Sequence, residues 1–268
     1  MFRHKKKLGQ NFLVNSEIIN KIVELGNINQ KTNIVEIGPG TGNLTLALLK
    51  KNPKKIHSIE FDKDLKNNLE NIKNNYGNFS YEISDALKVD ECKIFNEKII
   101  IYGNLPYNIS VPLLIKWIST KIWPPYYDKL ILMFQKEVAE KIIAQNNSKK
   151  YGRISILCAT KLNVKFNFNV NKENFFPQPK INSSVLTFTP KKVSLLNNQE
   201  LSILSQLTAK IFNNKRKMIG KSLKKIFTDN ELIELNFEKI AKLRPENLDN
   251  TIYYKMVKLI NKRQNKIN

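Results

Sequence analysis

Short apolar runs alternate with segments of helical spacing through the first half of the chain, and this alternation restricts the possible folds more than any other feature. The runs typical of buried strands are residues 33–38, 55–61, 79–83, 98–104 and 129–134. The segments with helical spacing are residues 43–51, 62–73, 111–119 and 135–146. Buried strands that alternate with helices form parallel sheets with helices on both faces. We therefore predict the α/β class.

The two ends of this region show other patterns. Residues 16–25 predict a short amphipathic helix, for which Asn15 or Ser16 is a suitable N-cap. Residues 162–170 and 185–189 alternate polar and apolar side chains, which is typical of half-exposed strands. We therefore expect the parallel sheet to end in antiparallel strands.

The pattern changes near Pro190, because only helical spacing follows it. A domain boundary is expected within residues 190–197. Residues 1–192 are then a sheet-containing domain, and residues 193–268 are a small all-α domain. Since 268 residues suffice for a sizeable core, a large domain with a helical appendage is a reasonable size.

The chain is strongly basic, with 45 Lys and Arg against 23 Asp and Glu and a net charge of +22. This excess is larger than solubility requires and is typical of proteins that bind nucleic acid. A general bias toward lysine is the alternative, because the chain is also rich in Asn and Ile. A hydrophobic content of 41% favours a folded protein over a disordered one.

Several classes of protein are disfavoured by what the sequence contains. Cys92 and Cys158 have no neighbouring ligand pattern and only two histidines are present, so neither a zinc site nor a disulfide framework is expected. The apolar runs are too short to span a bilayer. The basic run at residues 5–7 precedes a polar stretch, unlike a signal peptide. We expect a soluble, cytoplasmic protein without a metal.

A glycine-rich turn follows the first predicted strand, in the sequence IVEIGPGTG at residues 34–42. Glycine lets the backbone turn sharply and lets a ligand approach where a Cβ would clash. The spacing is G-x-G-x-G, which differs from the G-x-G-x-x-G of dinucleotide-binding enzymes. The turn therefore indicates a nucleotide-like ligand but argues against a nicotinamide oxidoreductase.

Two acidic residues strengthen this interpretation. Glu60 closes the second predicted strand, where a carboxylate can accept hydrogen bonds from both ribose hydroxyls. Asp85 follows the third strand, where it could accept from the exocyclic amine of a cofactor's adenine. The carboxyl ends of parallel strands share one edge of the sheet, and ligands of open α/β folds bind at that edge.

The residues Asn104-Leu105-Pro106-Tyr107 end the fourth predicted strand. A polar side chain, a stiff bend and an aromatic ring at this place suit the binding of a flat base whose amino group receives a methyl group. The amino nitrogen of adenine is a poor nucleophile, so its lone pair must be oriented toward the methyl donor. The Asn104 side chain and a backbone carbonyl near Leu105 are suitable acceptors for that amino group, while Pro106 fixes the bend. Tyr107 offers a face on which the base can stack. Such positioning contributes roughly 7–11 kcal/mol in well-aligned systems.

These motifs together resemble the ribosomal RNA adenine dimethyltransferases, specifically the family that modifies the small subunit. The resemblance extends over nearly the whole chain. Its matching segments are 9–13 (GQNFL), 36–42 (the glycine turn), 104–110 (NLPYNIS), 134–138 (FQKEV) and 175–180 (FFPQPK). The fold that this resemblance implies is a Rossmann-like methyltransferase sheet with a C-terminal helical domain.

The resemblance also implies a cofactor and a set of site residues. S-adenosylmethionine would be the methyl donor, in contact with Asn11, Leu13, Gly38, Glu60, Asp85 and Asn104. The catalytic loop would contribute Asn104, Leu105 and Tyr107, and Phe175 would be a second aromatic that stacks on the base. An adenine must leave its base stack to enter such a pocket.

The implied reaction is dimethylation of N6 on each of two adjacent adenines in a hairpin near the 3′ end of small-subunit rRNA. The implied partner is that rRNA within a pre-ribosomal subunit, and the enzyme is expected to be a monomer with a role in subunit biogenesis.

Residues 215–227 predict a two-faced helix in the C-terminal domain. Lys217, Lys221, Lys224 and Lys225 fall on one side, and Ile219, Leu223, Ile226 and Phe227 fall on the other. A basic face backed by an apolar one suits a helix that presents cations to phosphates. A solvated lysine face is the alternative. With the net charge and the resemblance, we expect RNA contact through residues 193–268.

Two other functions share part of this evidence. The large-subunit rRNA methyltransferases of macrolide resistance have the same glycine loop and Asn-x-Pro-Tyr motif, although they usually carry Ile where this chain has Leu105. Other relatives act as transcription or ribosome assembly factors that bind nucleic acid with or without methylation. The intact loop with Asn104 and Tyr107, together with Glu60, favours retained chemistry.

Overall fold

The computed structural model describes residues 10–266. Gly9, the first residue of the N-terminal motif, and the basic run at residues 5–7 lie outside the described residues. Tertiary contacts divide the described chain into two compact units. The first unit comprises residues up to 117, 125–139 and 164–190, and the second comprises 118–124, 140–163 and from 191 onward. Two segments before Pro190 therefore group with the helical C-terminal region.

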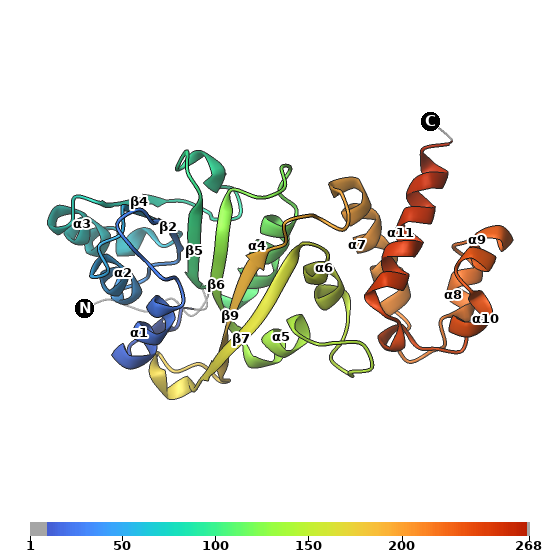
Figure 1. Cartoon of the computed structure of the whole chain (residues 1–268). Coiled ribbons are helices and arrows are strands. Elements are labelled where there is room, and N and C mark those ends of the chain that lie inside the picture. The colour runs from blue at the N-terminus through green and yellow to red at the C-terminus, as the bar shows by residue number, and fades with distance from the viewer. Residues whose placement is uncertain (1–9, 267–268) are drawn as a thin grey trace. The chain divides into compact units, whose positions relative to one another are not determined.

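A seven-stranded sheet, with the order β4-β3-β2-β5-β6-β9-β7, forms the centre of the first unit (Figure 1). Its strands are β2 (Asn33–Ile37), β3 (Lys55–Glu60), β4 (Phe79–Ile83), β5 (Ile99–Asn104), β6 (Tyr127–Gln135), β7 (Leu162–Val170) and β9 (Ser183–Pro190). Every strand expected from the sequence is present, with its ends displaced by a residue or two at most. The α/β class is confirmed.

The direction of the strands also agrees with the sequence patterns. Strands β2, β3, β4, β5 and β6 run parallel to one another, whereas β9 pairs with β6 in the antiparallel direction. All five residues of β2 are buried, which shows that both faces of the sheet are covered at its centre. A mostly parallel sheet with helices is the Rossmann-like arrangement that the resemblance implied.

The helices before β9 that begin in the first unit are α1 (Ser16–Glu24), α2 (Asn43–Leu49), the 3-10 turn η2 (Lys63–Leu65), α3 (Lys66–Asn75), η3 (Glu91–Lys93), α4 (Tyr107–Ile118), α5 (Lys136–Ile142) and η4 (Lys172–Asn174). The five α-helices match the segments that the spacing predicted, although α5 ends four residues before the expected end at residue 146, whereas η3 and η4 were not expected. The Asn15 side chain caps α1 by accepting from the backbone N–H groups of Glu17 and Ile18. Helix α4 begins earlier than expected, directly within the Asn104–Tyr107 motif.

The core beneath α1, α2 and α3 is a single apolar cluster. Helix residues such as Ile22, Leu48 and Leu69 pack there with Ile34 of β2 and Ile56 of β3. Full burial of an aliphatic side chain contributes about 1.5–3 kcal/mol. The cluster therefore anchors the strands whose ends form the site described below.

A small two-stranded ribbon was not expected from the sequence. Strands β1 (Phe12–Leu13) and β8 (Phe175–Phe176) pair antiparallel, so that Phe12 lies opposite Phe176 and Leu13 opposite Phe175. The backbone N–H of Val14 extends the pairing by donating to the Asn174 carbonyl oxygen at 2.9 Å. The ribbon joins two segments that the family resemblance had marked separately.

The second unit is helical among its described residues beyond Pro190. Its elements are α6 (Arg153–Lys161), α7 (Asn198–Phe212), α8 (Gly220–Lys224), α9 (Asp229–Glu234), α10 (Phe237–Ile240), η5 (Pro245–Asn247) and α11 (Asn250–Gln264). Helix α6 was not anticipated from the sequence. Within residues 10–266 no helix has both the length and the apolar character needed to cross a membrane.

The helix expected over residues 215–227 was wrong in its extent, because α8 covers only Gly220–Lys224. The chain before it forms turns, and the N–H groups of Ile219 and Gly220 donate to the carbonyl oxygens of Leu243 and Ala241. These donors are thus taken by another segment, so the helix starts later than its side-chain pattern suggests. The two-faced pattern itself is present: Lys217, Lys221, Lys224 and Lys225 are exposed, and Ile219, Leu223 and Phe227 are buried.

Candidate active site

The strand register brings three of the expected site residues to one level at the carboxyl edge of the sheet. Ile37 of β2 pairs with Ile59 of β3 and with Gly103 of β5. Gly38, Glu60 and Asn104, which directly follow these three residues, therefore lie at one level. The N–H of Gly38 continues the ladder by donating to the Ile59 carbonyl oxygen at 2.9 Å. The site follows from the register of three parallel strands.

A pocket opens at this edge and encloses about 720 Å³, including solvent at its mouth. Its lining includes most of the expected cofactor and catalytic residues: Asn11, Leu13, Gly38, Glu60, Asn104, Leu105 and Tyr107. Gln10, Phe12, Thr41 and Asn43 line the pocket from the same segments, and Leu65 lines it from η2. The N-terminal segment, the glycine turn and the Asn104–Tyr107 loop thus share one cavity.

The glycine turn has a conformation that side chains rarely adopt. Gly38 has a φ of 70° and Gly40 a φ of 59°, both in the left-handed region. A Cβ added at Gly40 would lie 2.6 Å from the ring of Phe12. The turn therefore keeps its backbone open toward the pocket while Phe12 closes over it.

Glu60 places a buried carboxylate at the pocket wall. Its Oε2 accepts from the Gly40 N–H at 3.1 Å, and its Oε1 accepts from the Asp62 N–H at 2.8 Å. Burial raises the pKa of Glu60, and backbone hydrogen bonds from Asp62, Gly40 and Phe61 oppose this shift. An ionised carboxylate has about four acceptor sites, so these backbone donors leave capacity for at least one hydroxyl of a ribose.

Asn104 links the catalytic loop to the N-terminal segment. Its Nδ2 donates to the main-chain oxygen of Asn11 at 3.1 Å. This hydrogen bond sets the orientation of the side-chain amide, so Oδ1 is the atom that remains to accept from a substrate's amino group. Asn104 is half-buried, as is expected of a residue that closes a strand at the rim of a pocket.

Leu105 and Tyr107 complete the loop. Leu105 is buried, and its side chain fills the space beside Gly103, where a Cβ would lie 2.6 Å from Leu105 Cδ2. The Tyr107 hydroxyl lies 2.8 Å from Ser183 Oγ on β9. Burial raises the pKa of Tyr107, so the phenol stays neutral at physiological pH. The hydrogen bond to Ser183 holds the Tyr107 ring at the pocket wall.

Two expected site residues are not among those that line the pocket. Asp85 follows β4 and uses Oδ1 to accept from the N–H of Leu87 at 3.0 Å, which closes a tight turn. Phe175 is 4% exposed and belongs to the apolar core cluster through its place in β8. Its neighbour Phe176, which is 61% exposed, carries the ring on the outer side of that ribbon.

The sequence did not single out several residues that support the site. Asn43, the first residue of α2, donates from Nδ2 to the Leu13 main-chain oxygen at 2.8 Å. Glu36 lies under α2 and accepts from the hydroxyls of Thr45 and Ser58 at 2.7 and 2.8 Å. Burial raises the pKa of Glu36 to about 7. A carboxylate in the middle of a buried strand was the available signal for Glu36.

No metal site is suggested by the described part of the chain, because residues 10–266 hold no group of three or more His, Cys, Asp and Glu that could bind an ion. The polar groups that line the pocket are amides, backbone groups and the Glu60 carboxylate. Such a set suits the hydroxyls and amines of a nucleoside-like ligand.

Several known proteins are similar to this chain in sequence. The chain is 42% identical over 261 residues to ribosomal RNA small subunit methyltransferase A of Pelagibacter ubique, and 95% of each protein is covered. It is 40% identical over 232 residues to the protein of the same name from Zymomonas mobilis. This alignment covers 86% of this chain and 82% of that protein.

Solved structures give the same result. A dimethyladenosine transferase from Plasmodium falciparum superimposes with a TM-score of 0.80 and 28% identity, over 94% of this chain and 98% of that one. The 23S rRNA methyltransferase ErmE has a TM-score of 0.68 at 21% identity, over 92% of this chain and all of that one, which is a likeness of fold. The family model of ribosomal RNA adenine dimethylases matches residues 1–263. The chain therefore belongs to the ribosomal RNA adenine dimethylase family.

Proposed function

We propose that this protein dimethylates N6 of two adjacent adenosines in the 3′-terminal hairpin of small-subunit rRNA. Family membership makes it an rRNA adenine dimethyltransferase with S-adenosylmethionine as the methyl donor. The observation that carries the proposal is the hydrogen bond between Asn104 and Asn11 at a pocket that also contains Gly38 and Glu60. The Asn104 amide and the Glu60 carboxylate line the same cavity, which supports assigning one to the base and the other to the ribose of the donor.

The donor side of the pocket consists of the glycine turn and Glu60. S-adenosylmethionine supplies an electrophilic methyl group on a sulfonium cation. Glu60 would accept from the ribose hydroxyls, and Gly38 would allow the donor to approach the backbone closely. Asn11 and Leu13 would contact the donor from the N-terminal segment, and Asp85 would accept from its adenine amine.

The acceptor side consists of the loop that starts α4. Asn104 Oδ1 would accept one hydrogen from the adenine amino group, and a backbone carbonyl near Leu105 would accept another. These two acceptors favour the pyramidal nitrogen, whose lone pair points at the methyl group. Tyr107 would stack on one side of the base. Phe175, which the resemblance assigns to the other side, would have to turn out of the core cluster to reach it. Since the donor is already cationic, positioning is the main catalytic task.

The substrate is proposed to be rRNA within a pre-ribosomal subunit, bound by a monomeric enzyme in the cytoplasm. The exposed lysines around α8, within residues 193–268, would contact phosphates of that RNA. A role in small-subunit biogenesis is consistent with a substrate that is only partly assembled.

The proposal is tested by incubation of the purified protein with labelled S-adenosylmethionine and either unmethylated small subunits or large-subunit RNA. Incorporation into the small subunit supports the proposal. Incorporation into large-subunit RNA alone would instead indicate a methyltransferase of the macrolide-resistance type. Tight subunit binding without incorporation would identify an assembly factor that lacks the chemistry.

A further inference from the structure

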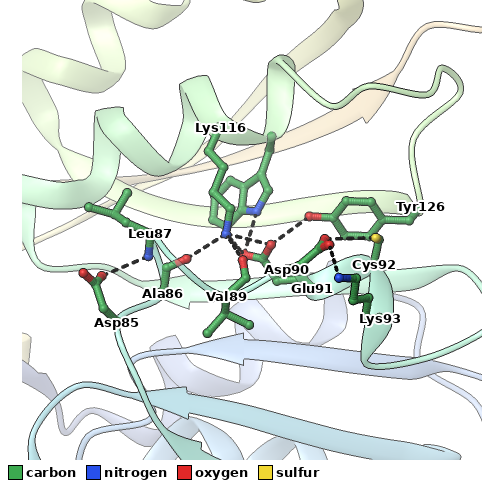
Figure 2. Close-up of polar contacts among 11 residues, drawn as sticks. Asp85, Ala86, Leu87, Val89, Asp90, Glu91, Cys92, Lys93, Lys116 and Tyr126 are labelled. Atoms are coloured by element: carbon green, nitrogen blue, oxygen red, sulfur yellow. Dashed lines mark hydrogen bonds and ion pairs between the residues drawn. The ribbon is translucent and has the colours of Figure 1, made fainter.

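Lys116 of α4 binds the loop that follows β4. Its ammonium group donates to the main-chain oxygens of Ala86, at 2.7 Å, and Val89. It also forms an ion pair with Glu91, with a distance of 2.8 Å from Nζ to Oε2. A lysine ammonium has three donors, and each of these three acceptors can engage one. Figure 2 shows the Lys116 side chain at the centre of this set of contacts.

Glu91 is held as firmly as the lysine. Its side chain is 1% exposed, whereas that of Lys116 is 26% exposed. Besides Lys116, the carboxylate accepts from Trp117 Nε1 at 3.2 Å. It also accepts from the Tyr126 hydroxyl at 3.1 Å (Figure 2). Burial and the neighbouring Glu91 charge raise the pKa of Tyr126, which therefore remains a donor. The position of the Lys116 ammonium group is thus fixed by the Glu91 carboxylate, which is itself held by hydrogen bonds from other side chains.

A continuous series of hydrogen bonds leads from Lys116 to Asp85. The Ala86 carbonyl, which Lys116 binds, and the Leu87 N–H belong to the same planar peptide group. That N–H donates to Asp85 Oδ1 at 3.0 Å. Because the peptide is rigid, holding its oxygen also fixes the direction of its N–H. The orientation of the Asp85 carboxylate therefore depends on Lys116, and Oδ2 is the oxygen left for a ligand.

The same lysine lies on the helix that begins in the catalytic loop. Helix α4 starts at Tyr107, and Lys116 lies on it, so the two halves of the site share one rigid element. We propose that Lys116, held by Glu91, is a positioning residue that sets the Asp85 carboxylate and thereby the selectivity for the adenine of the methyl donor. This inference rests on the proposed function, since it assigns Asp85 to that adenine.

The effect can be measured with two ligands that differ along the edge of the purine that Asp85 would bind. S-adenosylhomocysteine has an amino group at C6 and an unprotonated N1, whereas S-inosylhomocysteine has a carbonyl oxygen at C6 and an N1–H. Their affinities would be compared by calorimetry for the wild-type protein, Lys116→Met, and Lys116→Met with Glu91→Gln. The double variant is needed because Lys116→Met alone leaves a buried carboxylate without its cation, which lowers stability. Lys88→Met, at an exposed position of the same loop, is the matched control.

We expect the wild-type protein and Lys88→Met to prefer the adenine ligand. In the double variant the affinity for S-adenosylhomocysteine should fall about tenfold, the usual effect of one misplaced hydrogen bond to a charged group. The affinity for S-inosylhomocysteine should not change, so that the ratio of the two affinities becomes smaller. Asp85→Ala combined with the double variant should cause no further loss, since both changes act on one contact.

Two results would overturn the inference alone: a preference in the double variant equal to that of the wild type, or an equal loss of affinity for both ligands together with a lower melting temperature. The second result would show that the ion pair serves only folding. If the wild-type protein bound neither ligand, the proposed cofactor would be overturned as well.

Discussion

The side-chain Nδ2 of Asn104 donates to the main-chain oxygen of Asn11 at 3.1 Å, across 93 residues of sequence. This contact joins the end of β5 to the segment that precedes α1. Its consequence is that the amide of Asn104 has one orientation, with its oxygen available to an amino group. The residue that holds the N-terminal segment in place is therefore also the one that we propose binds the amino group of the substrate.

We predict that Asn104→Ala lowers the methylation rate at saturating substrate by about 100-fold, the usual cost of a misplaced reactive group. The variant loses both the acceptor and the link to Asn11. Single-turnover kinetics with small subunits measures the effect. Asn108→Ala, at an exposed position in the first turn of α4, is the control and should keep the wild-type rate.

Glu60→Gln should weaken binding of the methyl donor about tenfold or more, because hydrogen bonds to a charged carboxylate are stronger than those to an amide. The rate at saturating donor should change little. Calorimetry with S-adenosylhomocysteine measures the affinity. Glu97→Gln removes an exposed carboxylate at the opposite edge of the sheet, where Glu97 pairs with Lys54, and should leave the affinity unchanged. Equal losses in both variants would refute the assignment of Glu60.

Glu36 should make the stability depend on pH. Burial raises its pKa from 4.5 in the unfolded chain to about 7 in the folded protein. Folding therefore favours the neutral carboxyl, which adds to the unfolding free energy at low pH. This stabilisation is complete below pH 4.5 and is lost as the pH rises through about 7. The total loss of unfolding free energy is about 3 kcal/mol, because each tenfold change in proton affinity corresponds to about 1.36 kcal/mol.

Glu36→Gln is neutral at every pH and should lack this contribution to the slope. Urea unfolding at several pH values between 4 and 8 compares the two proteins. The unfolding free energy of the variant should increase relative to that of the wild type as the pH rises. Parallel stability curves would show that Glu36 is ionised in the folded protein throughout.

Charge reversal at Lys221 and Lys224 should weaken binding to pre-ribosomal subunits and leave donor binding intact. Each lost phosphate contact reduces the salt dependence of log K by about 0.7–0.9, so the salt slope should become shallower. Reversal of Lys31 and Lys50, which are exposed in the first unit, changes the net charge equally and serves as the control. Unchanged affinity at physiological salt, or equal effects in both variants, would contradict an RNA-binding role for α8.

Much of the fold could be predicted because its signals are local. Buried strands, the cap at Asn15 and the glycine turn each depend on residues close together in sequence. The parallel order of the strands then places Gly38, Glu60 and Asn104 at one edge without further information. For the same reason the motifs at successive strand ends identified most of the residues that line the pocket.

What could not be predicted depends on contacts between distant segments. The pairing of Leu13 with Phe175 involves strands of two residues, which are too short for any periodicity to indicate. The late start of α8 depends on hydrogen bonds from Ile219 and Gly220 to residues beyond α10. Likewise, the role of Lys116 depends on main-chain oxygens in a separate loop, and an isolated lysine on a helix gives no sign of it.

The most direct test of the account is to map methylated bases by mass spectrometry in small-subunit rRNA treated with the wild-type protein, Asn104→Ala or Asn108→Ala. We predict dimethyladenosine at two adjacent positions of the 3′-terminal hairpin for the wild-type protein and Asn108→Ala, with a loss of both modifications for Asn104→Ala. Full dimethylation by Asn104→Ala, or modification at another site by the wild-type protein, would contradict the account.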